Sequence, residues 1–311
     1  MESWDLVVVG AGPAGLTAGI YGARSGLRTL VVEEKLLGGA VAETPLVENY
    51  PGFSEGISGR DLADRLAAHC RRSGAEIREL ESLVELSFKG RKGTVKTDKN
   101  AYSVSAVIIA TGCYYKELGV PGEREFRGRG VSYCTLCDGP LFKRKKVLVV
   151  GGGNTGAISS IYLANLTSDV KLVHRRSQLR AEEALVKDMH KQEVNILWNT
   201  ELKEIRGDAV VKSVVLRNNK TGETREADVD GVFIQIGEVP NSQVAKEAGI
   251  DVDRDGYIIV DSHQRTNISG VYAAGDVTTS PVKQIGTAVG QAIIAATEAF
   301  GHAKQPYYYK R

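Results

Sequence analysis

The sequence LVVVGAGPAG at residues 6–15 is followed later in the chain by a similar sequence, VLVVGGGNTG, at residues 147–156. Each copy has four apolar residues that predict a buried strand, a glycine-rich turn, and then a helical segment. A second apolar strand follows each copy and ends at Glu33 or at His174. One Gly-x-Gly-x-x-Gly pattern alone is weak evidence. Two copies in this strand–turn–helix context predict two dinucleotide-binding βαβ units of the Rossmann type.

Further helices and short alternating strands follow each repeat. We expect a helix over Asp61–Ser73 after the first repeat and another over Ala181–Lys191 after the second. The stretches Gly90–Gly93 and Asn218–Gly222 have the composition of hairpin turns. The sequence therefore predicts an α/β fold with two Rossmann-like, doubly wound nucleotide-binding domains, each carrying an antiparallel β-meander.

The last part of the chain returns to the pattern of the first domain. A short strand ends in Gly275-Asp276, and a helix is expected from about Gln284 to Phe300. Because Asp276 lies too far along the chain to serve the second repeat, we expect this part to complete the first domain. The second domain would then be an insertion, with Pro and Gly at both linkers, as is common between domains. The predicted first domain comprises residues 1–116 and 239–311, and the predicted second domain comprises residues 117–238.

A cysteine pair, Cys134 and Cys137, lies shortly before the second repeat. On its own a Cys-x-x-Cys pair is weak evidence, because it can bind zinc, form a structural disulfide or act as a redox dithiol. Zinc would need two further ligands, and of the five histidines only His174 and His190 lie in the same half. Two nucleotide-binding patterns beside a dithiol favour an electron relay from a nicotinamide through a flavin to sulfur. We therefore predict no metal site.

Composition narrows the class of protein. The chain has 311 residues, of which 42% are hydrophobic and 25% charged, as expected for a globular protein of about two domains. The net charge of +2 argues against nucleic-acid or membrane-surface binding driven by bulk charge. The sequence has no apolar run of about 18 residues and no secretory signal, so we expect a cytoplasmic protein. The cytoplasm is reducing, and disulfides of proteins there are mostly transient and catalytic. Cys70 and Cys113 are expected to be ordinary thiols.

Residues 5–300 resemble the low-molecular-weight thioredoxin reductases, flavoproteins of the pyridine nucleotide-disulfide oxidoreductase superfamily. The most specific shared motifs are Cys-Thr-Leu-Cys-Asp-Gly before the second repeat and Tyr-Ala-Ala-Gly-Asp near the end. The resemblance implies a homodimer with FAD on the first domain, NADPH on the second, and thioredoxin or a thioredoxin-like protein as partner. It also implies that Cys137 faces the flavin, that Cys134 attacks the partner disulfide, and that Asp138 is the acid/base.

The first glycine motif is the predicted FAD site. Gly10 permits the tight turn, Gly12 lets the backbone approach the pyrophosphate, and Gly15 allows the helix to pack on the strand. Glu33 is placed to accept hydrogen bonds from ribose hydroxyls, with Glu34 as the alternative. By resemblance, Ala110-Thr111-Gly112 packs beside FAD and Asp276 binds its ribityl chain. The family's Gln after the loop at Gly38-Gly39 is replaced here by Ala40 and Val41. The remaining predicted FAD residues are Pro13, Ala14, Gly39, Asn49, Gly275, Gln284 and Ile285.

The second glycine motif is the predicted NADPH site, formed by Gly151, Gly153, Asn154, Thr155 and Gly156. The position equivalent to Glu33 is occupied by His174, followed by Arg175 and Arg176, with Arg180 further on. A carboxylate there would bind the 2′-hydroxyl of NAD, whereas guanidinium groups match the oxygens of a 2′-phosphate. The basic residues therefore predict a preference for NADPH over NADH.

These features together predict an FAD-containing, NADPH-dependent thioredoxin-disulfide reductase. One alternative keeps the flavin and dithiol but changes an electron partner, with a reduced deazaflavin or ferredoxin as donor, or with oxygen as acceptor in a dithiol oxidase. A ferredoxin–NADP reductase of related fold is disfavoured by the dithiol. A non-catalytic nucleotide-sensing protein is the alternative from a different class. The tail Gln305–Arg311 is expected to be disordered, with a role in an interface or in packing as the alternative.

Overall fold

The computed structural model describes residues 1–44, 46–90 and 92–304. The tail Gln305–Arg311 therefore lies outside the described residues. The chain forms two compact units, of which unit 1 comprises Met1–Tyr114 and Val239–Arg311, and unit 2 comprises Tyr115–Glu238. The chain passes between the units twice, and the short strands β7 and β16 pair with each other at these passages. We call β7 (Cys113–Tyr115) the first crossing and β16 (Glu238–Pro240) the second crossing.

Unit 1 is built on a mixed sheet with the strand order β3–β2–β1–β6–β5–β4, in which β17 also pairs with β6. The pairs that join β3, β2, β1, β6 and β17 are parallel, and β4, β5 and β6 form an antiparallel meander. Because β17 comes from the last part of the chain, the C-terminal segment completes this sheet. The strands are β1 (Glu2–Val9), β2 (Thr29–Glu33), β3 (Glu76–Glu79), β4 (Leu83–Lys89), β5 (Lys92–Thr97), β6 (Ala101–Ile109) and β17 (Val271–Ala273).

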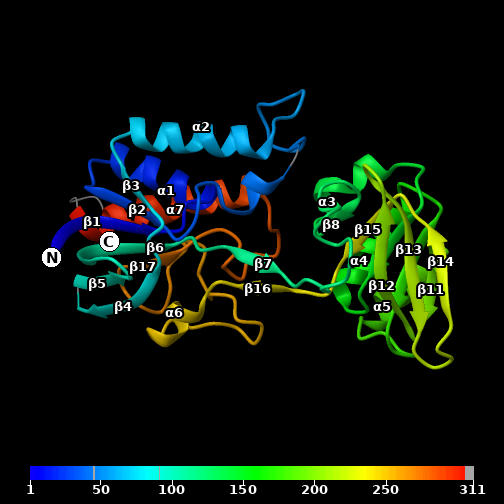
Figure 1. Ribbon diagram of the computed structural model, residues 1–311. Helices are drawn as coiled ribbons and strands as arrows, with labels where there is room; N and C mark the ends of the chain where they lie inside the picture. Colours follow the sequence, from blue (N-terminus) through cyan, green and yellow to red (C-terminus); the bar gives the residue numbers. More distant parts are fainter. Residues whose placement is uncertain (45, 91, 305–311) are drawn as a thin grey trace. The chain divides into compact units, whose positions relative to one another are not determined.

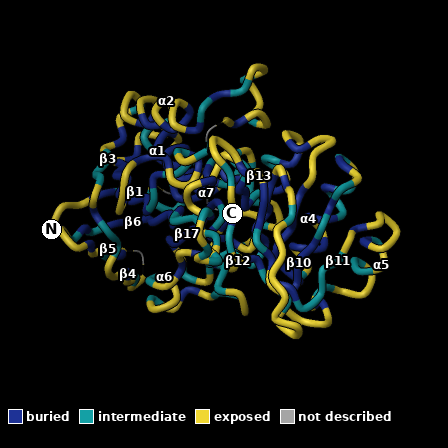
Figure 2. The backbone as a smooth tube through the Cα atoms, turned by 45° about the vertical axis from the view of Figure 1, so that its right-hand side comes forward, coloured by how far each residue is buried: buried dark blue, intermediate teal, exposed yellow. Residues whose placement is uncertain are grey.

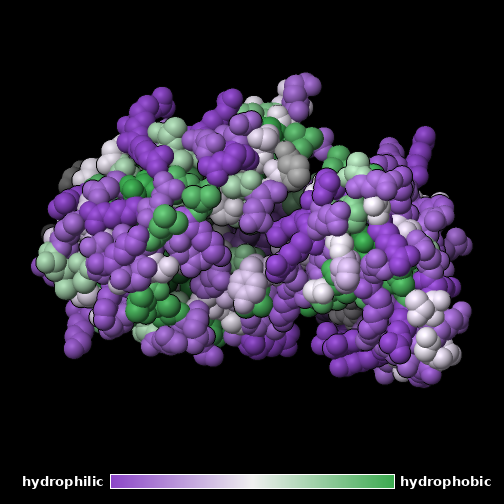
Figure 3. Space-filling view, in the orientation of Figure 1, coloured by the Kyte–Doolittle hydropathy of each residue, from purple (hydrophilic) through white to green (hydrophobic). Residues whose placement is uncertain are grey.

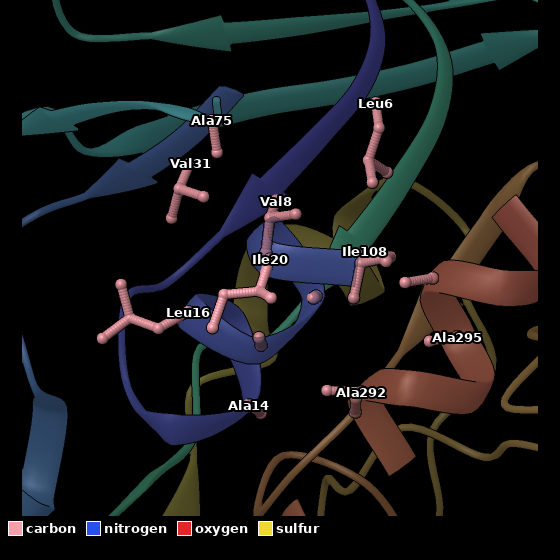
Figure 4. Packing of buried hydrophobic residues seen from close by; sticks show 14 of the residues in the cluster. Leu6, Val8, Ala14, Leu16, Ile20, Val31, Ala75, Ile108, Ala292 and Ala295 are labelled. Carbon is pink, nitrogen blue, oxygen red and sulfur yellow. The ribbon is translucent and has the colours of Figure 1, made fainter. Parts of the chain in front are cut away.

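The apolar run at the end of β1 is continuous because both faces of the sheet are covered. Leu6 and Val8 belong to a cluster with residues of α1 and α7, including Ile20 and Ala295 (Figure 4). Val7 and Val9, which alternate with them along β1, belong to a second cluster on the other face of the sheet. The burial map shows buried strands β1 and β6 and exposed residues along α2 (Figure 2). The helices are α1 (Pro13–Arg24), the 3₁₀ helix η1 (Gly39–Glu43), α2 (Gly59–Arg72), α6 (Gln243–Glu247) and α7 (Ile285–Lys304).

Unit 2 repeats the same plan on a smaller scale (Figure 1). Its parallel sheet has the order β11–β10–β9–β15–β8, and a separate antiparallel sheet has the order β12–β13–β14. The parallel strands are β8 (Val131–Ser132), β9 (Val147–Val150), β10 (Val170–His174), β11 (Asn195–Trp198) and β15 (Gly231–Ile234). The antiparallel strands are β12 (Thr200–Gly207), β13 (Val211–Asn218) and β14 (Thr224–Asp228). The helices are α3 (Thr135–Asp138), the 3₁₀ helix η2 (Gly139–Phe142), α4 (Asn154–Ala164) and α5 (Glu183–Lys191).

The predicted fold class is therefore confirmed: both units are doubly wound, and each carries an antiparallel meander. Hydrophilic residues dominate the face seen in Figure 3, and hydrophobic residues form small separate patches on it. None of the helices in the described ranges combines the length and apolar character needed to cross a membrane.

Candidate functional site: two glycine turns and a disulfide

The first glycine turn joins β1 to α1 and contains glycines of two kinds. Gly10 has a φ of +101°, and a Cβ there would lie 2.4 Å from the Ala110 carbonyl oxygen. A Cβ on Gly15 would lie 1.7 Å from the Gly10 carbonyl oxygen. Gly12 differs, because its φ is an ordinary −75° and a Cβ there would find its nearest neighbours, in Gly38 and Gly39, at 3.9 Å. The packing of the protein thus requires Gly10 and Gly15, whereas Gly12 would admit a Cβ at ordinary van der Waals distance.

The second glycine turn, between β9 and α4, shows the same division. Gly151 has a φ of +144°, and a Cβ there would lie 2.0 Å from the Gln235 carbonyl oxygen. A Cβ on Gly156 would lie 2.4 Å from the Gly151 carbonyl oxygen, whereas a Cβ on Gly153 would meet no described atom within 4 Å. Both turns therefore leave a cradle, free of side chain, in front of a helix N-terminus. Such a cradle fits a dinucleotide diphosphate, which binds where backbone N–H groups and the helix dipole favour anions.

Glu33 braces the first turn from the end of β2. One of its carboxylate oxygens accepts a hydrogen bond from the Ala11 N–H at 2.7 Å, and the other accepts from the Lys35 N–H at 2.9 Å. Each oxygen keeps a second lone pair that could accept from a ribose hydroxyl. Glu34 is more exposed and pairs with Lys35 at 3.2 Å. Of the two carboxylates, Glu33 is the one that the fold brings to the turn.

The last part of the chain reaches the same turn through Gly275. A Cβ on Gly275 would lie 3.0 Å from the Cβ of Ala14, so the Gly275-Asp276 corner packs against the start of α1. Two residues that the sequence analysis missed hold this corner. Gln291 of α7 accepts a hydrogen bond from the Gly275 N–H at 2.8 Å, and the Lys283 ammonium donates to the Asp276 carbonyl oxygen at 2.9 Å. A glutamine inside the apolar α7 was the available signal for Gln291.

The weaker FAD candidates also lie in unit 1. The Asn49 side-chain amide donates to Gln284 Oε1 at 3.1 Å, so the fold brings together two predicted residues that are far apart in sequence. Ile285 packs against the small cluster that contains Val41 of η1. Gly39 approaches the first turn closely, since a Cβ there would lie 3.2 Å from the Gly12 Cα.

The Ala110–Gly112 turn, which precedes the first crossing, is hydrogen-bonded to Asn241, the residue that follows the second crossing. The Thr111 hydroxyl donates to the Asn241 carbonyl oxygen at 2.7 Å, and the Asn241 side chain donates to the Thr111 carbonyl oxygen at 2.9 Å. The Asn241 N–H also donates to the Gly112 carbonyl oxygen at 3.0 Å. The Thr111 side chain thus has a structural contact, while Ala110 is the residue against which Gly10 turns.

Cys134 and Cys137 form a disulfide in unit 2, with Cα atoms 5.3 Å apart. Cys134 is the N-cap of α3, and its sulfur accepts a hydrogen bond from the Cys137 N–H at 3.2 Å. Donors at such a position stabilise a thiolate after reduction. The hydroxyl of Thr135, between the cysteines, donates to the Ser159 hydroxyl at 2.8 Å and so fastens α3 to α4. Asp138 is the last residue of α3 and is partly buried.

The other sulfur groups do not share this environment. Cys70 and Cys113, both within the described residues, form no disulfide. Burial raises the pKa of the Cys70 thiol to about 12, which keeps it protonated and unreactive. Among residues 1–44, 46–90 and 92–304, no group of three or more His, Cys, Asp or Glu side chains could hold a metal ion.

Three arginines on the loop after β10 are exposed, but His174 is buried. A Cβ on Gly152 would lie 2.2 Å from His174 Nδ1, and His174 Nε2 lies 2.9 Å from the Gln178 carbonyl oxygen. Burial lowers the pKa of His174, and the nearby arginines lower it further. The neutral ring thus supports the loop from inside. The exposed side chains are those of Arg175, Arg176 and Arg180.

The start of α4 carries a further contact that the sequence analysis missed. The Asn154 side chain donates to Glu182 Oε1 at 2.8 Å and accepts from the Glu182 N–H at 2.9 Å. This pair joins the second glycine turn to the start of α5. The Arg180 N–H donates to the Gly152 carbonyl oxygen at 2.7 Å. The loop after β10 that carries Arg175, Arg176 and Arg180, which we call the arginine loop, therefore lies directly beside that turn. Thr155 is exposed in the first turn of α4.

Comparisons with known proteins agree with this geometry. Residues 4–292 match the family described as pyridine nucleotide-disulphide oxidoreductase. The chain is 42% identical to a thioredoxin reductase of Bacillus subtilis, over 94% of this chain and 92% of that protein. It is 41% identical to a thioredoxin reductase of Treponema pallidum, over 95% of this chain and 96% of that protein. A crystal structure of thioredoxin reductase from Streptococcus pyogenes superposes with a TM-score of 0.93 at 38% identity, covering 98% of this chain and 99% of that one.

Proposed function

Because this chain belongs to the pyridine nucleotide-disulphide oxidoreductase family and, within it, to the thioredoxin reductases, we propose that it carries electrons from NADPH through FAD and the Cys134–Cys137 disulfide to thioredoxin. The enzyme is a flavoprotein oxidoreductase that uses FAD and NADPH. When bound, FAD supplies a carrier that accepts a hydride from a nicotinamide and delivers an electron pair to a disulfide. The strongest support is a disulfide in the same unit as a glycine turn that is flanked by exposed arginines.

Two sets of residues would hold the cofactors. The open cradle at Gly12, with Glu33 beside it and the Gly275-Asp276 corner against α1, suits FAD. The open cradle at Gly153, with the arginine loop beside it, suits NADPH, because exposed guanidinium groups can bind a 2′-phosphate through charge-assisted hydrogen bonds. Asn49, Gln284 and Ile285 remain weaker candidates for contacts with FAD.

Thiol–disulfide exchange then proceeds on the side chains of α3. With the disulfide reduced, the Cys134 thiolate attacks the disulfide of thioredoxin, which forms a mixed disulfide and releases one partner thiolate. Cys137 attacks Cys134 of that mixed disulfide, so that the enzyme disulfide forms again and thioredoxin leaves as a dithiol. Two protons must reach the partner sulfurs, and Asp138 is the proposed group that moves a proton there. We also propose that the protein is cytoplasmic, since a reducing compartment suits a transient disulfide. A homodimer is proposed from the resemblance to the low-molecular-weight thioredoxin reductases.

Serine variants of the two cysteines test this division of roles. Cys134→Ser and Cys137→Ser should each abolish thioredoxin reduction and leave flavin reduction by NADPH intact in an anaerobic titration. Only Cys134→Ser should show a long-wavelength absorption band, because it keeps a thiolate facing the flavin. A band in Cys137→Ser instead would reverse the assigned roles. Flavin that stays oxidised with NADPH but bleaches with reduced ferredoxin or deazaflavin would favour the alternative donors.

A further inference from the structure

A buried carboxylate anchors the segment that follows the first crossing. Glu123 is only 1% exposed. One of its oxygens accepts a hydrogen bond from the Leu118 N–H at 2.9 Å, and the other accepts from the Gly119 N–H at 2.7 Å and the Val120 N–H at 3.3 Å. Three successive backbone N–H groups therefore converge on one side chain. This arrangement fixes the path of the chain as it enters unit 2.

The same carboxylate also holds Tyr133, the residue directly before Cys134. The Tyr133 hydroxyl donates to Glu123 Oε1 at 2.7 Å. Its ring stacks on Tyr115, the last residue of the first crossing, with ring centroids 5.1 Å apart. Burial and the neighbouring Glu123 carboxylate raise the pKa of Tyr133, so the phenol remains a hydrogen-bond donor. The ring stack thus joins Tyr133 to the first crossing, and the hydrogen bond to Glu123 joins it to the segment that follows this crossing.

A residue shortly before the second crossing also contacts Tyr133. Gln235 lies between β15 and the second crossing, and its side-chain amide donates to the Tyr133 carbonyl oxygen at 3.0 Å. The Gln235 N–H donates in turn to the Val150 carbonyl oxygen at 2.7 Å. A Cβ on Gly151 would strike the Gln235 carbonyl oxygen, so this residue also borders the second glycine turn. Tyr133 is therefore held by Tyr115 of the first crossing and by Gln235, which lies shortly before the second crossing.

We propose that Glu123, Tyr133 and Gln235 are positioning residues for the redox disulfide. They fasten the backbone just before Cys134 to the segments of unit 2 that adjoin the two crossings, so that the dithiol is held in a fixed position within unit 2. This inference rests on the proposed function, because it concerns delivery of the dithiol to its electron partners. It makes a selective prediction: loosening Tyr133 slows the steps that use the disulfide and leaves unchanged the reduction of the flavin by NADPH.

Tyr133→Phe is the first test, because it removes one hydroxyl and keeps the ring stack on Tyr115. Reduction of thioredoxin by NADPH should fall in kcat by about 5- to 30-fold, as expected for one lost buried hydrogen bond and a slightly misplaced reacting group. The KM for NADPH and the rate of dye reduction, which needs only the flavin, should stay unchanged. Gln235→Leu removes the side-chain hydrogen bond to the Tyr133 carbonyl oxygen and should lower the ratio of thioredoxin to dye reduction at saturating NADPH. This ratio is its readout, since Gln235 borders the second glycine turn.

Tyr102→Phe is the matched control. Tyr102 is a buried tyrosine of unit 1 whose hydroxyl also donates to a buried carboxylate, that of Glu81. The Tyr102 hydroxyl also accepts a hydrogen bond from Arg78 at 2.9 Å. Tyr102→Phe should therefore lower the melting temperature at least as much as Tyr133→Phe does, without changing the ratio of thioredoxin to dye reduction. If Tyr133→Phe and Gln235→Leu both keep the unmutated ratio, or if Tyr102→Phe changes it equally, the inference is wrong. Lack of thioredoxin reduction by the unmutated protein would instead refute the proposed function.

Discussion

At the scale of single residues, the two glycine turns show which glycines serve the fold and which leave room for a ligand. A side chain at Gly10 or Gly15 would collide with the backbone of the protein itself. Gly12 and Gly153 have ordinary negative φ values. A Cβ on Gly12 would make ordinary van der Waals contacts at 3.9 Å, and a Cβ on Gly153 would meet no described atom within 4 Å. Alanine is therefore compatible with the fold at these two positions, and a defect in such a variant reports on the ligand.

Alanine at the open glycines should separate the two nucleotide sites. Gly12→Ala should fold with an unchanged melting temperature of its flavin-free form but retain much less FAD after gel filtration. Gly153→Ala should retain FAD fully and raise the KM for NADPH. We would measure flavin content by absorbance and KM by dye reduction. Full flavin content in Gly12→Ala, or an unchanged KM in Gly153→Ala, would contradict the assignment of the corresponding turn.

The sequence could predict the residues that carry a motif, but it could not predict those that support them. The cysteine pair and the glycine turns have recognisable spacings. Gln291, Lys283, Asn241 and Glu182 act through contacts with backbone or side chains that only the folded chain brings together. His174 was grouped with its arginine neighbours, but it is the last residue of β10 and its ring is buried, whereas the arginines follow on an exposed loop.

At the scale of elements, the loop from β10 to α5 should decide nucleotide preference. Each charge-assisted hydrogen bond to a 2′-phosphate contributes on the order of 1.5–3 kcal/mol. Arg175→Ala combined with Arg180→Ala should therefore reduce the preference for NADPH over NADH by roughly 100-fold or more, through a higher KM for NADPH. Lys187→Ala, on the exposed face of α5, is a control that should leave both KM values unchanged. Equal kinetics with NADPH and NADH in the unmutated protein would exclude this role.

The same loop should contribute to the pH dependence of stability through His174. Its pKa is lowered in the folded state by burial, so near its ordinary pKa the unfolded chain binds more protons than the folded one. The contribution of His174 to the free energy of unfolding is therefore complete above pH 6.5, the ordinary value, and is lost as the pH falls towards the folded pKa.

Urea unfolding of the unmutated protein and of His174→Asn, between about pH 5 and 7.5, measures this contribution. The difference in unfolding free energy between the two proteins should shrink as the pH falls. His190→Asn, at an exposed position of α5, controls for the change of residue type. A difference that is the same at every pH would show that His174 titrates alike in both states.

At the scale of the whole molecule, unit 2 carries both the disulfide and the second glycine turn, whereas the proposed flavin site lies in unit 1. The nicotinamide and the disulfide must each meet the same flavin, and they cannot both occupy one face of it at the same time. The chain passes between the units at two short crossings, which is the arrangement expected of a hinge. We therefore predict a large rotation of unit 2 relative to unit 1 during turnover.

Single-molecule energy transfer can detect this rotation. Dyes would be attached at exposed Glu55 in unit 1 and exposed Lys220 in unit 2 through noncanonical amino acids. Two populations should exchange, and their ratio should change when NADPH is added or when the disulfide is reduced. A dye pair placed within unit 2, at Lys220 and Lys187, should show one constant distance. A single population between the units under all conditions would count against the rotation.

Because unit 2 is inserted between β6 and β17, the two parts of unit 1 are synthesised at different times. The ribosome synthesises the whole of unit 2 before it makes β17 and α7, which complete unit 1. The ribosome adds the 190 residues from Tyr115 to Lys304 at about 5–20 residues per second, so the N-terminal part of unit 1 waits roughly 10–40 s for these elements to be complete. During this interval the faces of β6 and α1 that later contact β17 and α7 are uncovered. In the nascent chain, residues 1–114 should therefore need protection from aggregation until β17 and α7 have been made. The protein should bind FAD, and so turn yellow, only after that point.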